Sequence, residues 1–230
     1  MLEQVLIYER DAFLWLNGGH TAFWDHVMWL YSGKAVWLPL AAFMVAMLVY
    51  KKSWKESLLI LLAIALTITL CDQFASHVCK PLFTRFRPTH HPDFMEQVKI
   101  VFDYRGGKYG FISSHAANAF GFATFMSLLF RHKLFSVTIF LWAAVTAYSR
   151  IYLGVHFISD IVPGMVSGSL FGWLVYRIYE KVRWQCIPES RRLASHRLYT
   201  FRTKQTIVAA IWLTFLLLLL FNKPLVMWLR

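Results

Sequence analysis

The amino-acid sequence predicts an all-α, polytopic membrane helix bundle of about six spans, with amphipathic helices at its N-terminal end that lie in the membrane interface. Of its 230 residues, 58% are hydrophobic, and only 12 are acidic against 24 basic. The apolar residues form long runs, and basic residues separate these runs. Ten tryptophans, ten tyrosines and twenty phenylalanines suit bilayer interfaces. This composition is typical of an integral membrane protein and excludes an ordinary soluble domain.

Polar residues interrupt every apolar run in the first 31 residues. They are Asp11, Asn17, Gly18, Gly19, His20, Asp25 and His26. This pattern predicts one or two short amphipathic helices lying in the interface. The first ten residues lack a basic start and a small-residue cleavage site, so we expect no signal peptide.

Six apolar segments follow, at about 35–50, 57–78, 115–130, 135–153, 156–176 and 207–221. Several are shorter than the roughly 20 residues of a comfortable span. We expect one integral membrane domain over residues 1–230. Its parts are interfacial helices (1–31), core spans (32–178), a basic cytoplasmic segment (179–204) and an extra C-terminal span (205–230).

Basic residues gather after the first, third and fifth spans, which share one side of the membrane if every span crosses. They are Lys51, Lys52 and Lys55; Arg131 and Lys133; and Lys181, Arg183, Arg191, Arg192, Arg197, Arg202 and Lys204. The positive-inside rule puts this side in the cytoplasm. The segments 80–114 and 150–156 then share the outer face. We expect a bacterial-type inner membrane protein with its site on the periplasmic or extracellular side.

The net charge of +12 suggests an acidic partner. Because the basic residues lie between apolar spans, anionic lipid at the cytoplasmic face is favoured over nucleic acid. No obligate protein partner is expected. The odd number of cysteines, without paired ligand spacing, predicts neither a disulfide framework nor a metal site, and we interpret Cys71, Cys79 and Cys186 as small apolar fillers.

A first cluster, at the outer end of the second segment, contains Lys80, Arg85 and Arg87-Pro88. Lysine offers a point charge and arginine a two-pronged donor, and both suit phosphate oxygens. The alternative is that they are basic side chains that snorkel at a membrane end, which fits Arg85 better than Lys80 or Arg87.

A second cluster, Ser113-Ser114-His115, immediately precedes the third segment. Serines at a helix start cap free N–H groups, and the positive end of the helix dipole favours an anion. His115 would lie beside that anion. The alternative is a plain helix cap. The preceding glycines, Gly106, Gly107 and Gly110, are interpreted as either a hinge over the site or a turn.

A third cluster contains Arg150, His156 and Asp160, whose presence at a membrane boundary is costly without a function. If a helix begins near His156, this residue and Asp160 stand at i and i+4 on one face, where the carboxylate fixes the imidazole tautomer. The alternative is a helix end with one capping histidine. Glycines continue the same stripe and would let another helix approach closely; they are Gly164, Gly168 and Gly172.

These three clusters, in this order, resemble the signature of the phosphatidic acid phosphatase type 2 superfamily. Its first motif corresponds to Lys80 and Arg87-Pro88, and its third to Ser149-Arg150, His156 and Asp160. The second motif departs from the usual Pro-Ser-Gly-His, because Ile112 takes the proline place and Ser114 the glycine place.

The resemblance implies a lipid phosphate phosphatase. It implies that His156 attacks phosphorus to form a phosphohistidine, that Asp160 holds its imidazole and that His115 protonates the leaving oxygen. It further implies a phosphate-binding set, namely Lys80, Arg87, Ser113, Ser114 and Arg150. No cofactor and no metal are expected, since positive side chains take the place of Mg²⁺.

A site at an outer membrane surface suits an amphiphilic substrate. Undecaprenyl diphosphate and a lipid A phosphate are the favoured substrates; phosphatidic acid and phosphatidylglycerol phosphate are alternatives. A non-catalytic lipid-phosphate binder or transporter stays open, whereas the vanadium haloperoxidases with this anion site are soluble. Outer-loop residues are expected to be solvated, with head-group contact as the alternative: His90, His91, Lys99, Arg105 and Lys108. Asp72 and His77 are expected to form helix-end hydrogen bonds or to line the pocket.

Overall fold

The computed structural model describes residues 2–187 and 194–230, and these ranges form a helix bundle without strands. The α-helices are α1 (Leu2–Gly18), α2 (Ala22–Ser32), α3 (Leu38–Val49), α4 (Trp54–Gln73), α5 (Lys80–Phe83), α6 (Ser114–Phe130), α7 (Lys133–Tyr152), α8 (Ile158–Cys186), α9 (Phe201–Leu220) and α10 (Asn222–Leu229). A π-helical stretch, Phe74–Cys79, joins α4 to α5, and 3-10 turns cover Ala35–Trp37, Pro88–His90, Met95–Gln97 and Ser195–Arg197. The all-α prediction is confirmed.

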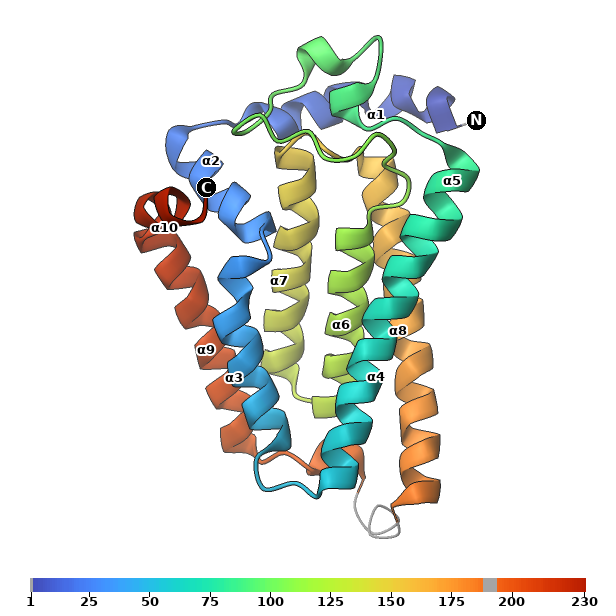
Figure 1. Ribbon diagram of the computed structural model, residues 1–230, viewed down its shortest axis with the longest axis vertical. Helices are drawn as coiled ribbons and strands as arrows, with labels where there is room; N and C mark the ends of the chain where they lie inside the picture. The colour runs from blue at the N-terminus through green and yellow to red at the C-terminus, as the bar shows by residue number, and fades with distance from the viewer. Residues whose placement is uncertain (1, 188–193) are drawn as a thin grey trace.

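The bundle has two distinct ends. Figure 1 shows α3, α4, α6, α7, α8 and α9 running along the long axis, with α1 lying across one end. The connection 84–113 covers this same end, which we call the α1 end. The turns after α3 and α6 and the C-terminal end of α8 lie at the opposite, far end. The basic segments and the chemically suggestive segments are therefore at opposite ends, as the sequence predicts.

Four helical segments among the described residues are long and apolar enough to cross a bilayer: Trp54–Phe83, Lys133–Tyr152, Ile158–Cys186 and Phe201–Leu220. A fifth crossing exists if Ala22–Ser32 and Ala35–Val49, which meet at a 70° bend, act as one span. The chain is therefore a multi-pass membrane protein. The expected count of about six was higher because α6 is only 17 residues long and the first span is broken.

Polar side chains fix where several helices begin. The Oγ of Ser53 accepts the Glu56 N–H at the start of α4, and the Oγ1 of Thr200 accepts the Thr203 N–H at the start of α9. The Nδ1 of His132 does the same for the N–H of Phe135. These caps satisfy N–H groups that the first turn of a helix leaves free.

The glycine stripe of α8 brings this helix against α6. A Cβ on Gly168 would lie 2.1 Å from the Ala117 carbonyl oxygen, and one on Gly172 would lie 2.3 Å from that of Gly121. At Gly164 the same atom would lie 2.8 Å from the Ser113 carbonyl oxygen. Only glycine permits this approach of two backbones, so the predicted role of the stripe is confirmed.

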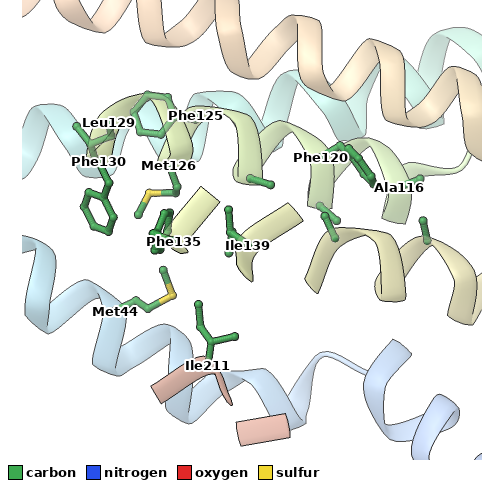
Figure 2. Packing of buried hydrophobic residues seen from close by; sticks show 14 of the residues in the cluster. Met44, Ala116, Phe120, Phe125, Met126, Leu129, Phe130, Phe135, Ile139 and Ile211 are labelled. Carbon is green, nitrogen blue, oxygen red and sulfur yellow. The ribbon is translucent and has the colours of Figure 1, made fainter. Parts of the chain in front are cut away.

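The apolar core lies where α6 meets α7, α3 and α9. Figure 2 shows Phe125, Met126 and Phe130 of α6 in this cluster, together with Phe135 and Ile139 of α7. All five side chains are at most 2% exposed. α6 is therefore the central helix of the bundle, packed against α7, α8 and α4.

Burial at the far end corrects part of the expected lipid-contact segment. Arg183 lies inside α8, is 4% exposed, and its Nε donates to Glu56 Oε1 at 2.8 Å. The acidic partner on α4 makes it a buried ion pair, and Lys204 is buried as well. Lys181, Arg197 and Arg202 are exposed, while Arg191 and Arg192 lie outside the described residues.

The cysteine prediction holds for two of the three residues. Cys71 and Cys79 are buried, as small apolar fillers should be. Cys186 is exposed, because α8 extends beyond the expected end at 176 into the far-end surface.

Candidate active site

The first cluster is placed by the continuous helix that ends with α5. Lys80 Nζ donates to Ser114 Oγ at 2.9 Å, across to the start of α6. Thr84 then adopts a left-handed conformation with φ 41° and ends the helix. Arg87 lies in the next turn, 8% exposed, and its Nε donates to the Tyr109 carbonyl oxygen at 3.1 Å. Segments 80–87 and 109–114 are thus tied together at the α1 end.

The second cluster forms the N-terminal end of α6. Ser113 caps the helix, its Oγ accepting the Ala116 N–H at 3.4 Å. The Ser113 N–H donates to the Asp160 carbonyl oxygen at 3.0 Å, which joins the start of α6 to the start of α8. His115 lies in the first turn of α6, so its imidazole belongs to the same helix end.

The third cluster spans the turn from α7 to α8. Arg150 lies in the last turn of α7 and is 2% exposed, and Gly154 turns the chain with φ 72°. His156 precedes α8, which begins only at Ile158, so the predicted helix start is two residues too early. The turn still brings His156 Nδ1 to 3.4 Å from Asp160 Oδ2. That oxygen also accepts the Phe157 N–H at 3.0 Å, which fixes the carboxylate.

Charged residues from all three clusters influence the imidazole of His156. Burial lowers the pKa of His156 well below its ordinary value, and the positive charges of Arg87 and Arg150 lower it further, followed by His115 and Lys80. Burial and Arg150 likewise lower the pKa of Arg87 to about 10. The structure therefore brings these predicted residues together around His156, with its neutral form favoured.

A buried ion-pair cluster behind His156 was missed in the sequence. Arg85, 2% exposed, donates to Asp160 Oδ1 at 2.9 Å and to Glu9 Oε1 at 2.8 Å. Glu9 comes from α1 and accepts both the N–H and the hydroxyl of Ser159, at 2.8 and 2.5 Å. The snorkelling interpretation of Arg85 is wrong, because two buried carboxylates compensate its charge. Its position two residues before Arg87 was the only available signal.

Arg150 has two hydroxyl partners that sequence patterns did not indicate. Its guanidinium donates to Tyr104 Oη at 3.0 Å and to Ser32 Oγ. Burial raises the pKa of Tyr104, but the charge and hydrogen bond of Arg150, together with the charges of Arg87 and Lys34, lower it more, so the pKa is lowered overall. A pocket of about 420 Å³ opens here and is lined by Trp29, Ser32, Gly33, Lys34, Tyr104, His115, Arg150 and Leu153.

Other outer-loop residues do not join the site. Lys99, Arg105 and Lys108 are exposed, as expected, whereas His90 and His91 are half-buried. His77 is exposed, and Asp72 lines a pocket with Ser114 and His115. Within residues 2–187 and 194–230, no group of three or more His, Cys, Asp or Glu could hold a metal ion.

Comparisons with known proteins identify the family of this chain. The family model of the PAP2 superfamily matches residues 57–184. A lipid A 4'-phosphatase of Porphyromonas gingivalis is 46% identical over 80% of this chain and 78% of its own, and one of Bacteroides thetaiotaomicron is 40% identical over 79% and 81%. The crystal structure of Aquifex aeolicus LpxE has a TM-score of 0.54 at 27% identity, over 74% of this chain and 95% of its own. The chain belongs to the PAP2 superfamily and is a membrane-embedded phosphoric ester hydrolase.

Proposed function

We propose that this protein removes a phosphate group from lipid A at the non-cytoplasmic face of the membrane, through a phosphohistidine at His156. The observation that carries the proposal is the gathering of Lys80, Arg87, Arg150 and two histidines at one end of the bundle. The two lipid A 4'-phosphatases at 46% and 40% identity support this substrate.

The nucleophile is the Nε2 atom of His156. Its Nδ1 faces Asp160, so the carboxylate accepts the Nδ1 proton and leaves the Nε2 lone pair for phosphorus. Attack forms an N–P bond and breaks the bond from phosphorus to the lipid oxygen. The lowered pKa of His156 keeps the imidazole neutral at physiological pH, which the attack requires.

His115 handles the protons of both steps. It donates a proton to the departing lipid oxygen, which leaves as an alcohol. It then takes a proton from a water molecule, whose oxygen attacks phosphorus as the N–P bond breaks and inorganic phosphate forms. Its place in the first turn of α6 keeps it beside the helix N-terminus that stabilises the anion.

The positive side chains stabilise the transition state. Lys80, Arg87 and Arg150 surround the phosphoryl oxygens as negative charge spreads over them, and Ser113 with the Ser114 N–H supplies further donors. Lys80 is already held beside this helix end by Ser114 Oγ. Because these groups come from α5, α6, α7 and the loop at Arg87, the site is complete only in the folded bundle.

The distribution of charge supports an outer-facing site. The basic residues Lys51, Arg131 and Lys181 belong to the far end, which the positive-inside rule assigns to the cytoplasm. The α1 end then faces the periplasm of a bacterial inner membrane. Exposed Arg197 and Arg202 at the far end suit contact with anionic lipid.

Phosphate release from purified protein tests the proposal. With EDTA present, we expect the protein to convert lipid A to a product one phosphate lighter by mass spectrometry, and to act more slowly on undecaprenyl diphosphate. His156→Ala should lower the rate at least about 10⁴-fold, since it removes the nucleophile. Full activity of that variant would remove His156 from this role, and a strict need for an added divalent ion would contradict the metal-free mechanism.

A further inference from the structure

A chain of three neighbouring pockets leads away from the phosphate site along α3. The pocket beside Arg150 shares Ser32, Gly33, Lys34 and His115 with a second one of about 340 Å³. This second pocket extends between the bend at Gly33 and the helices α4, α6 and α7, and it adds apolar residues such as Trp37 and Phe122.

The second pocket leads into a third that is almost wholly apolar. Trp37, Ala41, Phe122 and Trp142 line both, so the two share a wall. The third pocket measures about 240 Å³ and adds Leu40, Met44, Val45, Leu48, Leu61, Ile64, Ile139 and Ile211. Figure 2 shows Met44, Ile139 and Ile211 approaching one another from α3, α7 and α9. The lining thus changes from charged to apolar with distance from His115.

We propose that these pockets form one groove that binds a hydrocarbon chain of the lipid substrate, with Lys34 at its mouth. The proposal rests on the proposed function, because it assumes a lipid phosphate at His156. An extended chain matches the order of linings, since its phosphate needs the cations at one end and its methylene groups favour the apolar residues beyond.

The bend between α2 and α3 makes this groove. Ala22–Ser32 and Ala35–Val49 meet at 70°, and Gly33 and Lys34 form the break. α3 packs against α4 much less closely than α6 packs against α8, which leaves space on this side of the bundle. On the α8 side the glycine stripe brings α6 and α8 into backbone contact, which leaves no room for a chain between these two helices.

Blocking the groove tests the proposal with a matched control. Ala41 is exposed at the rim and lines the second and third pockets, whereas Ala46, also exposed on α3, lines none of the three. Ala41→Trp should lower kcat/KM for dodecyl phosphate about tenfold, because several methylene groups lose their site, and leave p-nitrophenyl phosphate within about twofold. Ala46→Trp should change neither rate. If the ratio of kcat/KM for dodecyl phosphate to that for p-nitrophenyl phosphate were the same in Ala41→Trp and wild type, the groove would be overturned.

A binding measurement keeps the test independent of turnover. A dodecyl phosphate with a diazirine at its chain end is photolysed with His156→Ala protein, and labelled peptides are identified by mass spectrometry. Labels on residues 40–48 and 139–142 are the expected result. Labels on the exposed face of α8, at Val162, Val166 and Leu170, would reject the groove. Failure of wild type to hydrolyse any phosphate would reject the proposed function instead, and the labelling pattern would still decide where the chain binds.

Discussion

The bundle contains a buried arginine–carboxylate cluster at each end, and the two have different surroundings. At the far end, Arg183 donates to Glu56, which also accepts the hydroxyl of Tyr179 at 2.9 Å. At the α1 end, Arg85 lies between Glu9 and Asp160. Both arginines are buried, at 4% and 2% exposure, and both pair at 2.8 to 2.9 Å.

What distinguishes the α1 end is an imidazole and surplus positive charge. Asp160 faces both Arg85 and His156, while the charges of Arg87, Arg150 and Lys80 act on that same imidazole. The far-end cluster joins α4 to α8 through the pairing of Arg183 and Tyr179 with Glu56. A buried ion pair therefore does not identify a site by itself; its contact with a histidine among cations makes the α1 end the candidate site.

Removing one of the surplus positive charges at the α1 end should have the largest effect on activity among the changes that separate the two ends. Arg87→Gln should lower kcat/KM about 10² to 10³-fold, because a donor to the transition state is lost. It should also shift the pH profile. The Arg87 charge lowers the pKa of His156, so its loss lets that pKa rise toward 6.5 and more imidazole is protonated at pH 6.

The measurement is kcat/KM between pH 5 and 8 with the same substrate, so that titration of the substrate phosphate is common to both proteins. The acid limb should move to higher pH in Arg87→Gln and stay in place in Arg87→Lys, which keeps the charge. An acid limb at the same pH in Arg87→Gln and wild type would mean that the Arg87 charge does not lower the pKa of His156.

A paired replacement of the two arginines should separate their functions. Arg85→Ala and Arg183→Ala each leave carboxylates buried without a cation, which costs about 3 to 5 kcal/mol. Both should therefore lower Tm. Only Arg85→Ala should also lower kcat of the folded protein, about 10²-fold with little change in KM, since Asp160 loses the partner that orients it.

Replacement of Arg85 by lysine distinguishes a residue that positions Asp160 from one that only stabilises the fold. Arg85→Lys keeps a charge beside Asp160 and should recover at least about a tenth of kcat. Equal losses of kcat in Arg85→Ala and Arg183→Ala, measured well below both Tm values, would remove the distinction between the two ends.

Much of the fold and the site follows from local sequence patterns. Apolar runs predicted the helices, and the spacing of Gly164, Gly168 and Gly172 predicted the close contact of α8. Residues with unusual chemistry at a membrane boundary, such as Arg150 and His156, predicted where the site lies because burial there needs a reason. The structure brings these residues together, and their catalytic roles stay a prediction.

The rest depends on long-range contacts that no local pattern contains. Glu9 and Arg85 are 76 residues apart, and nothing in an amphipathic first helix marks one glutamate as buried. Ser32 and Arg150 are 118 residues apart. Arg183 looked like a lipid contact because its partner Glu56 is 127 residues away. The sequence gives residue types, whereas the packing of α1 and α4 decides which charges are compensated.

The smallest expected effect concerns Glu9, which touches the site only through Arg85 and Ser159. Glu9→Gln keeps the shape and most hydrogen bonds but removes one charge, so Arg85 pairs with Asp160 alone. We expect kcat to fall about tenfold with KM unchanged, because Ser159 and the start of α8 lose a charged acceptor. Glu56→Gln, the matched change at the far end, should lower Tm and leave kcat within about twofold. Steady-state kinetics and thermal melts of both variants measure this, and equal kcat values for the two would show that α1 covers the site without positioning it.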